Sequence, residues 1–319
     1  MHTEIIFLGD VMLGRMVNET IDQVDPSYVW GNTLAIIKGA DLRIINQEFA
    51  ITDSPTPVEK TFNFRMSPAH LKALTVADID YVNLANNHIL DYDDVGMEDT
   101  LNTLKTTNIV YGGAGMNKQE ACSPHILDVN DLKIGIISCS DHYDNWAVTD
   151  AKPGIQWMTI DNEGLKVIEQ HIHTLQGQVD YIVLCLHWGP NMRQVPPQHF
   201  QDFARACVDL GIDIFHGHSA HVFQGMEIYK GRPIFYDTGD FIDDYRIDDT
   251  LRNDQGFIFQ VTLNDQAIQA ITLTPTLTTQ CQINLTPNPT DQLSKMQQLS
   301  KQLGCILTVK DNKLHTNLQ

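Results

Sequence analysis

Positive charge is scarce in this sequence. Its 319 residues include 21 Lys and Arg against 40 Asp and Glu, which gives a formal net charge of −19. A protein with this balance repels the phosphates of nucleic acids and the headgroups of anionic lipids. We therefore exclude nucleic acid and anionic membrane surfaces as partners. The surplus of carboxylates is compatible with cation binding and equally with a solvated acidic surface.

Long apolar runs and paired cysteines are also missing. No apolar run reaches the ~18 residues of a membrane span, and the opening stretch MHTEIIFLGD lacks the basic start and cleavage site of a signal peptide. We therefore expect a cytoplasmic protein with no membrane span. The six cysteines are widely spaced and form no CxxC pair, which argues against a thiolate zinc site and against a disulfide scaffold.

The sequence does contain several short apolar runs that each end in polar donors. The runs are TEIIFL, DLRII, YVNLA, YIVLCL and GIDIF, and the last is followed by three histidines within six positions, at 216, 218 and 221. In chain order the donors after these runs are Asp10, Glu48, Asn87, His88, His187, His218 and His221. Short apolar runs of this kind predict buried strands, and the carboxyl ends of neighbouring strands meet at one edge of a sheet. The pattern predicts a metal or active site there, and the alternative is chance clustering.

The segments between these runs predict an α/β fold. Helical spacing of apolar residues occurs over 94–106 and 161–175, and again between Pro197 and Gly211. Hairpin signals at residues 130–131 and 264–265 predict antiparallel strands, so we expect mixed sheets. We assign residues 1–275 to one domain and interpret 276–319 as a C-terminal appendage to it. The appendage is expected to contain a helix from Thr290 or Asp291 through Leu303, followed by the strand CILTV from Cys305.

Five motifs, in order, resemble one known family. They are GDVMLGR (9–15), NQEFAIT (46–52), LANNHILDYDDVGMEDTL (84–101), HWGPNMRQVP (187–196) and GHSAHVFQGMEIYKGRPIFYDTGDF (217–241). The set resembles the CapA family, named for a protein of poly-γ-glutamate capsule biosynthesis and similar in fold to the calcineurin-like metallophosphoesterases. The resemblance covers roughly residues 4–262. It implies a metallophosphatase-like α/β/β/α sandwich with mixed sheets and a site at the carboxyl ends of the strands.

The resemblance also implies roles for single residues. Catalysis would involve His88 together with Asp10 and His187. The implied metal ligands are Asp10, Glu48, Asn87, His187, His218 and His221. The implied cofactor is one or two divalent metal ions, with Zn, Mn or Fe favoured by this mixed set of O and N donors and Ca or Mg as alternatives.

The sequence departs from the phosphoesterase pattern at three positions. Met12 stands where many phosphoesterases have a second ligand histidine, and Glu48 replaces the usual bridging aspartate. One of two metal positions is therefore expected to be weakened. Asp240 stands where asparagine is more common, and it begins an acidic run with Asp243, Asp244, Asp248 and Asp249. That run is either a solvated loop or a group that acts near a hard cation.

We expect the substrate to contact Arg15, Arg193, Trp188 and Asp240. A guanidinium fork can clamp a carboxylate or phosphate, although a structural ion pair is the alternative for both arginines. Trp188 either forms a wall of the pocket or packs the end of the sheet. For Lys60 and Arg65 two roles also stay open: they either add to an anion site or lie as exposed charges on the edge of a β-sheet. Asp141 and His142 either reach the site or form a local turn.

Three functions remain open at this point. The first is a metal-dependent hydrolase acting on a peptide, poly-γ-glutamate-like or phosphoester substrate, with His88 protonating the leaving group because an unperturbed imidazole has a pKa near neutrality. The second, taken from soluble relatives in the resembled family, is a peptide epimerase that inverts a Cα centre. The third is a non-catalytic scaffold that binds polyglutamate or a synthase partner. Oligomeric state is not indicated.

Overall fold

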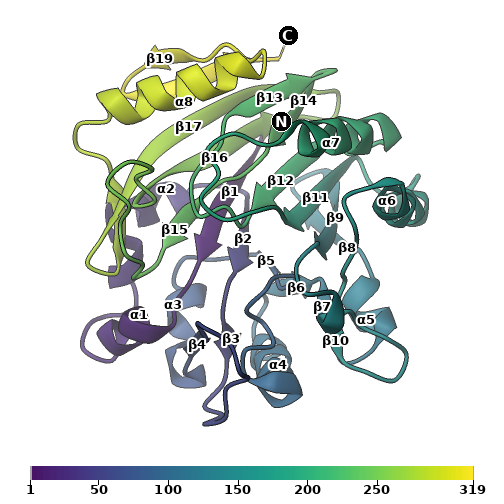
Figure 1. Cartoon of the computed structure of the whole chain (residues 1–319). Coiled ribbons are helices and arrows are strands. Elements are labelled where there is room, and N and C mark those ends of the chain that lie inside the picture. The colour runs from purple at the N-terminus through teal and green to yellow at the C-terminus, as the bar shows by residue number, and fades with distance from the viewer. Residues whose placement is uncertain (1, 319) are drawn as a thin grey trace.

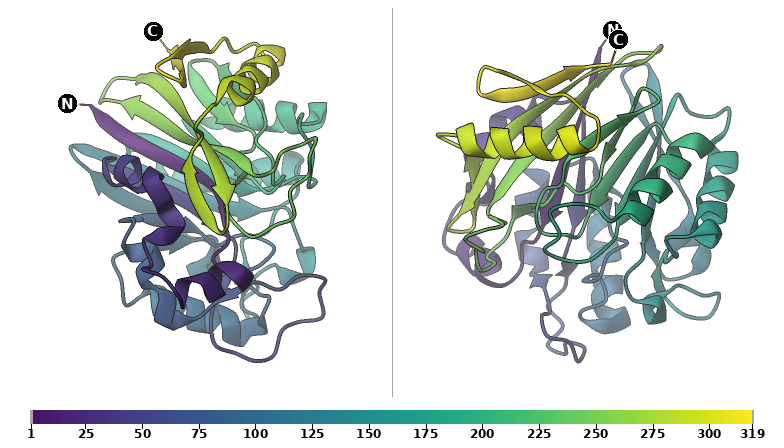
Figure 2. Two further views of the ribbon diagram at one scale, coloured as in Figure 1. Left: turned by 90° about the vertical axis from the view of Figure 1, so that its left-hand side faces the viewer. Right: turned by 45° about the horizontal axis from the view of Figure 1, so that its top comes forward.

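Two β-sheets packed face to face, with helices on both outer sides, form the protein (Figures 1 and 2). The computed structural model describes residues 2–318. The arrangement confirms the predicted α/β/β/α sandwich with mixed sheets. Among these residues, no helix combines the length and the apolar composition that crossing a bilayer requires.

The larger sheet has its first strands near the middle and its last strands at one edge. Its order is β19-β20-β17-β16-β1-β2-β5-β6, with β15 paired to β1 and β18 paired to β17. The bounds are β1 (Thr3–Val11), β2 (Leu42–Gln47), β5 (Tyr81–Asn83), β6 (Val110–Gly112), β15 (Asp240–Ile242), β16 (Gln255–Leu263), β17 (Ile268–Thr279), β18 (Gln282–Leu285), β19 (Thr308–Lys310) and β20 (Lys313–Asn317).

The smaller sheet has the order β13-β14-β12-β11-β9-β8. Its strands are β8 (His125–Val129), β9 (Leu132–Ser140), β11 (Tyr181–His187), β12 (Ile214–His218), β13 (Met226–Tyr229) and β14 (Arg232–Phe235). Two short pairs lie outside both sheets: β3 (Ala50–Ile51) with β4 (Arg65–Met66), and β7 (Ala114–Gly115) with β10 (Gly154–Ile155).

Helices cover the two outer faces, and α8 packs against the core between the sheets. The set is α1 (Arg15–Ile21), α2 (Leu34–Lys38), α3 (Lys72–Thr75), α4 (Asp93–Leu104), α5 (Lys118–Cys122), α6 (Asn162–Leu175), α7 (Gln198–Leu210) and α8 (Thr290–Gln302). Buried residues of α1 to α4 pack on the larger sheet, whereas those of α6 and α7 pack on the smaller one. The right-hand view of Figure 2 shows α6 and α7 together on one side of the molecule.

Alternation along the strands creates three apolar layers. In β1, Ile5 and Phe7 point into the core between the sheets, and Ile6 points toward the helices. In β11, Val183 enters the core between the sheets, and Leu184 packs under α6 and α7. Both strands are apolar on both faces because both faces are covered. This explains why they appear in the sequence as continuous apolar runs.

The predicted helices and hairpins are confirmed. The helix α6 begins after Asp161, whose side chain accepts hydrogen bonds from the N–H groups of Glu163 and Gly164. The helix α7 ends at Gly211, which has φ 124°, a value that favours glycine. The hairpins β8–β9 and β16–β17 are antiparallel, as expected from their turn residues.

The C-terminal segment continues the larger sheet. The helix α8 agrees with the sequence prediction, but the strand expected from Cys305 begins only at Thr308. The reason is that the N–H of Cys305 still donates to the carbonyl of Ser300 at the end of α8. The division at residue 275 stays a prediction, and it falls inside β17. The hydroxyl of Ser300 also accepts a hydrogen bond from the N–H of Met226, on the outermost strand of the smaller sheet, at 3.1 Å.

Truncation of one aromatic side chain between the sheets should destabilise the protein strongly. Phe259 is fully buried, and its ring lies 4.9 Å from the ring of Phe235 on the opposite sheet. We expect Phe259→Ala to lower the free energy of unfolding by about 3–5 kcal/mol. The matched control is Phe62→Ala, because Phe62 is 58% exposed and should lose about 0.5 kcal/mol at most. Urea denaturation measures both, and equal losses would contradict the assigned core.

Candidate metal centre

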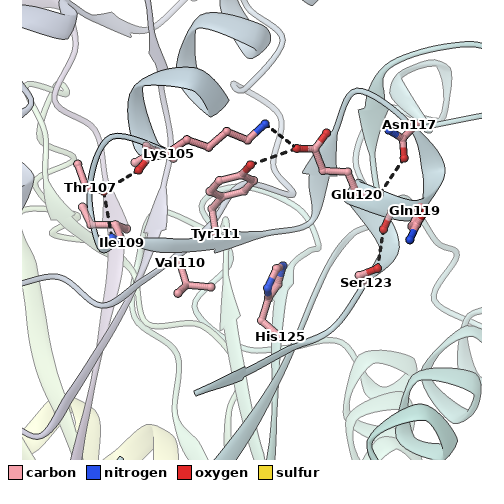
Figure 3. Close-up of a pocket in the computed structure, with 11 residues that line it drawn as sticks. Lys105, Thr107, Ile109, Val110, Tyr111, Asn117, Gln119, Glu120, Ser123 and His125 are labelled. Carbon is pink, nitrogen blue, oxygen red and sulfur yellow. Dashed lines mark hydrogen bonds and ion pairs between the residues drawn. The ribbon is translucent and has the colours of Figure 1, made fainter. Parts of the chain in front are cut away.

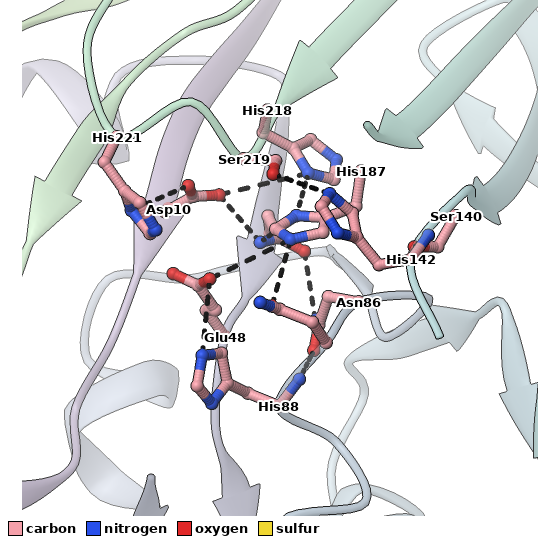
Figure 4. Close-up of polar contacts among 12 residues, drawn as sticks. Asp10, Glu48, Asn86, His88, Ser140, His142, His187, His218, Ser219 and His221 are labelled. Carbon is pink, nitrogen blue, oxygen red and sulfur yellow. Dashed lines mark hydrogen bonds and ion pairs between the residues drawn. The ribbon is translucent and has the colours of Figure 1, made fainter. Parts of the chain in front are cut away.

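The candidate site lies where strand ends from both sheets meet. In the larger sheet, Asp10 of β1 lies beside Asn46 of β2 and Asp240 of β15. In the smaller sheet, His187 at the end of β11 pairs with His218 at the end of β12. Figure 4 shows the side chains of Asp10, His187 and His218 converging from these strands. Residues far apart in the chain are therefore brought into one cluster.

A glycine allows this convergence. A Cβ atom on Gly9 would lie 1.8 Å from the carbonyl oxygen of Gly239, so no larger residue fits at that position. The N–H of Asp10 donates to the same carbonyl at 2.9 Å. The close approach holds Asp10 against the loop that leads into Asp240.

Asp10, His187 and His218 form the first group of ligand atoms, all within 4.8 Å of one another. The Nδ1 atoms of the two histidines are 2.9 Å apart, and His218 Nδ1 is 3.9 Å from Asp10 Oδ1. On the other side of the ring, His187 Nε2 lies 3.1 Å from Asn87 Oδ1. Burial lowers the pKa of both histidines well below the usual value. They are therefore neutral, which is the form of imidazole that binds metals.

Asp10 is shared with a second group, which contains Glu48, His221 and Asp240. His221 Nδ1 donates to Asp240 Oδ1 at 2.8 Å and lies 3.7 Å from Asp10 Oδ2. Burial alone would lower the pKa of His221, but the surrounding Asp240, Glu48 and Asp10 raise it well above the usual value. The second group thus holds three carboxylates around a single imidazole.

The cluster has too little positive charge for its carboxylates. Burial raises the pKa of Asp10 to about 6 and that of Asp240 well above the usual value, and burial together with the charge of Asp10 does the same to Glu48. Within residues 2–318, four buried atoms of the two ligand groups have no hydrogen-bond partner: Asp10 Oδ2, Glu48 Oε1, Asp240 Oδ2 and His218 Nε2. Buried polar atoms are normally paired. A divalent cation would supply both the charge and the partners, so these residues fit a metal ion.

His88 lies beside the two ligand groups. Its Nδ1 donates to Asp91 Oδ2 at 2.5 Å, and its Nε2 faces Glu48 Oε1 at 3.9 Å. The ring stacks on Phe64 with the ring centres 4.0 Å apart. Burial lowers the pKa of His88 to about 4, below the near-neutral value of an unperturbed imidazole, so the ring is neutral at pH 7. A neutral imidazole can release a proton only after it has accepted one.

A cavity of about 450 Å³ adjoins the cluster. Its lining includes the site residues Asn87, His88 and His221 and the basic residues Arg15, Lys60 and Arg246. Arg15 also lies 3.3 Å from Asp244, and Lys60 2.7 Å from Asp91. Arg15 therefore takes part in an ion pair and lines the cavity at the same time.

Two of the expected substrate residues lie elsewhere. Trp188 donates its indole N–H to the carbonyl of Tyr236 at 2.9 Å, and its ring lies 4.9 Å from that of Phe215 in the layer under α6 and α7. Arg193 is exposed, and its carbonyl accepts a hydrogen bond from Gln224. Within residues 2–318, neither lines the cavity beside the cluster. Of the two roles considered for Trp188, a wall of the pocket or packing of the sheet end, the structure shows packing of the sheet end.

The structure also shows the surroundings of Asp240 and Met12, two positions at which the sequence departs from the phosphoesterase pattern. Asp240 belongs to the second ligand group rather than to the lining of the cavity. Met12 is fully buried in the layer under α1 to α4, and its sulfur accepts a hydrogen bond from the N–H of Gly14 at 3.0 Å. Met12 therefore does not take the place of the missing histidine.

Sequence reasoning missed or left open several neighbours of the cluster. Asp91, three residues after His88, was missed, although a donor so close in a turn could have been noticed. Tyr245 was also missed, and its hydroxyl donates to Glu48 Oε2 at 3.4 Å. His142, which was left open, has its ring centre 5.1 Å from that of His187 (Figure 4).

A larger hollow of about 520 Å³ lies away from these residues (Figure 3). It contains none of the predicted site residues, and its charged groups are already paired. Glu120 accepts a hydrogen bond from the hydroxyl of Tyr111 at 3.1 Å and lies 3.1 Å from Lys105 Nζ. We therefore place the functional site at the cluster and not at this hollow.

Comparison with known proteins gives a family match. The model of the family "Bacterial capsule synthesis protein PGA_cap" matches residues 4–245. The capsule biosynthesis protein CapA of Bacillus anthracis is 28% identical over 318 residues, which cover 98% of this chain and 76% of that protein. A probable polyglutamine synthesis accessory protein of Mycobacterium tuberculosis is 32% identical over 249 residues, covering 74% of this chain and 65% of that protein. This chain therefore spans about two thirds to three quarters of the length of these relatives.

One solved structure has a similar fold over most of the chain. It is a hypothetical protein from Thermus thermophilus, with a TM-score of 0.53 and 14% sequence identity. The alignment covers 89% of this chain and all of that one. At this identity the likeness concerns the fold alone.

Removal of one buried carboxylate should stabilise the metal-free protein. Because the pKa of Glu48 is raised in the folded state, its ionisation opposes folding, and stability is lost as pH rises from the ordinary value of 4.5 through the folded pKa. We expect Glu48→Gln to raise the free energy of unfolding at pH 8 by about 1 kcal/mol or more, and to have a smaller effect at pH 5. Denaturation of chelator-treated protein measures this. Glu163→Gln, on the exposed side of α6, should change little, and a loss of stability in Glu48→Gln at pH 8 would contradict the charge imbalance.

Proposed function

The chain belongs to the bacterial capsule synthesis protein PGA_cap family, and from that premise we propose that it is a metal-dependent hydrolase. The proposed substrate is a peptide-like acidic chain of the polyglutamate type, with a small phosphoester as the second class. One observation carries the proposal: two groups of buried ligand atoms share Asp10 and adjoin a cavity with basic residues in its lining. The names of the relatives, which refer to capsule and polyglutamine synthesis, support the choice of substrate.

The metal ligands in this proposal come from both sheets. Asp10, His187 and His218 would hold one ion, with Asn87 beside them, and Asp10, Glu48, His221 and Asp240 would hold a second. A bound divalent ion activates a water molecule and polarises the carbonyl or phosphoryl group that it contacts. Zn, Mn and Fe suit this donor set best.

His88 would move the proton. Its Nδ1 is held by Asp91, so its Nε2 is the free nitrogen and is directed to the cluster. As a neutral imidazole it can accept a proton from the attacking water and pass it to the leaving group. Asp91 is itself held by the backbone N–H of Phe64 and by Lys60, which keeps the ring of His88 in one orientation.

The basic residues around the cavity would orient an acidic substrate. Arg15 and Arg246 line the same cavity as His88 and His221. A guanidinium group can bind a carboxylate or phosphate through two parallel hydrogen bonds. A side-chain carboxylate of the substrate would thus be fixed while the scissile bond lies over the ligand groups.

A second candidate function is epimerisation of a peptide Cα. The observation that favours it is that His88 and His221, from different loops, line one cavity. Inversion of a Cα centre needs one group to remove a proton and another to return it. A scaffold that only binds polyglutamate is the third candidate, and it predicts no turnover.

Loss of one histidine should remove metal and activity together. We expect His187→Ala to lower the affinity for Mn²⁺ or Zn²⁺ by at least about tenfold and to abolish turnover. The control is His173→Ala, at an exposed position of α6, which should keep both. Metal analysis after dialysis and an activity assay measure the outcome, and full turnover in metal-free His187→Ala would end the hydrolase proposal.

The reaction class can be read from one incubation in D₂O. Metal-loaded protein is mixed with γ-linked and α-linked glutamyl peptides and with an aryl phosphate. Hydrolysis should give new termini or free phosphate, whereas epimerisation should give deuterium at Cα without cleavage. Mass spectrometry separates these results. If no product of either kind forms while the peptide still binds, the scaffold function is favoured.

A further inference from the structure

A second, smaller cavity lies beside the loop that follows β15. It has a volume of about 170 Å³, and its lining includes the carboxylates Asp243 and Asp244. The lining also includes the end of β17 and the turn after it, with Thr278, Gln280 and Cys281. These last three residues lie beyond residue 245, where the match to the family model ends. No residue of the two ligand groups at the strand ends lines this cavity.

Asp243 is a buried carboxylate with one oxygen free. The residue is 6% exposed, and its Oδ1 accepts a hydrogen bond from the N–H of Tyr245 at 2.7 Å. In the part of the chain that the structure describes, its Oδ2 has no hydrogen-bond partner. None of the ion pairs found within residues 2–318 includes Asp243. The fixed Oδ1 leaves Oδ2 as the atom available to the cavity.

Asp244 repeats this arrangement. Its side chain is 1% exposed, and its Oδ2 accepts a hydrogen bond from the N–H of Met16 at 3.0 Å and lies 3.3 Å from Arg15 Nε. Among the described residues, its Oδ1 has no hydrogen-bond partner. A third carboxylate of the lining, Asp254, differs because both of its oxygens accept hydrogen bonds from Arg252. Two carboxylates of the lining therefore each have one oxygen without a partner, and the third carboxylate is already satisfied.

We propose that this cavity binds a hard divalent cation of the Ca²⁺ type through Asp243 Oδ2 and Asp244 Oδ1. Ions of this class take carboxylate oxygens together with neutral oxygens and water. Threonine, glutamine and asparagine residues, which carry neutral oxygens, are present in the lining. A volume of about 170 Å³ leaves room for the ion and several water molecules, each of which occupies roughly 30 Å³.

The chemistry of the lining favours a hard ion over a soft one. No histidine lines the cavity within the described part of the chain. Two sulfur-containing residues line the cavity, Met16 and Cys281. Burial raises the pKa of the Cys281 thiol, so it stays protonated and binds metals weakly. The neutral thioether of Met16 is only a weak acceptor. The strand-end cluster contains three imidazoles and suits different metals. The two sites would therefore select different ions.

Binding of Ca²⁺ to a variant with a disabled strand-end cluster tests this site. The background is the full chain with Asp10→Asn and Glu48→Gln, which removes two carboxylates of the cluster. We expect this protein to bind about one equivalent of Ca²⁺ in equilibrium dialysis. Adding Asp243→Asn should weaken that binding by at least about tenfold, because the charge of the ligands sets Ca²⁺ affinity. The matched control is Asp249→Asn in the same acidic run, an exposed position, which should leave binding unchanged.

The outcomes are unambiguous with respect to this site. Absence of saturable Ca²⁺ binding in the background protein, or unchanged binding after Asp243→Asn, would overturn the proposal. If Asp243→Asn fails to fold by circular dichroism, Asp244→Asn provides the same comparison. The test does not depend on the proposed hydrolase, because the background lacks that centre.

Discussion

The burial of three carboxylates around one imidazole is the constraint that the rest of this structure serves. Asp10, Glu48 and Asp240 are fully or almost fully buried, and His221 supplies the one imidazole in their ligand group. Like charges in a medium of low dielectric repel, and a loosely packed protein would let them move apart. The cluster therefore requires rigid support from both sheets, and it explains why oxygens without partners persist at the centre of a well-packed domain.

That support comes from neutral amides as much as from the apolar layers. Asn46 donates its side-chain N–H to Asp10 Oδ1 at 2.7 Å, and Asn83 and Asn86 donate in turn to Asn46 Oδ1. This chain of amides runs across β1, β2 and the end of β5. It fixes the position of Asp10 without adding a positive charge, so the carboxylates remain short of cations. Hydrogen bonding provides the geometry, and the charge of the site is left for a ligand.

Much of this arrangement follows from the sequence because apolar runs that end in donors specify where each donor lies. The strand ends at Asp10, His187 and His218 were predictable in this way. The position of Trp188 could also have been predicted from the sequence. Successive side chains in an extended chain point to opposite faces, so a residue next to His187 points away from the site. The pKa of His88 could not be predicted, since it depends on burial under Phe64 and a contact with Asp91 that only folding creates. The cavity at Asp243 was equally hidden, because residues 278–281 complete it.

The contact between Ser300 and Met226 has a consequence for how this chain can be handled. The strand β13 is an edge strand of the smaller sheet, and the N–H of Met226 on it donates to the hydroxyl of Ser300 on α8. An edge strand with unpaired N–H and C=O groups can pair with strands of other molecules. A fragment ending before α8 would therefore expose this edge strand. Self-association of such a fragment would be an artefact of the truncation and not a property of the intact protein.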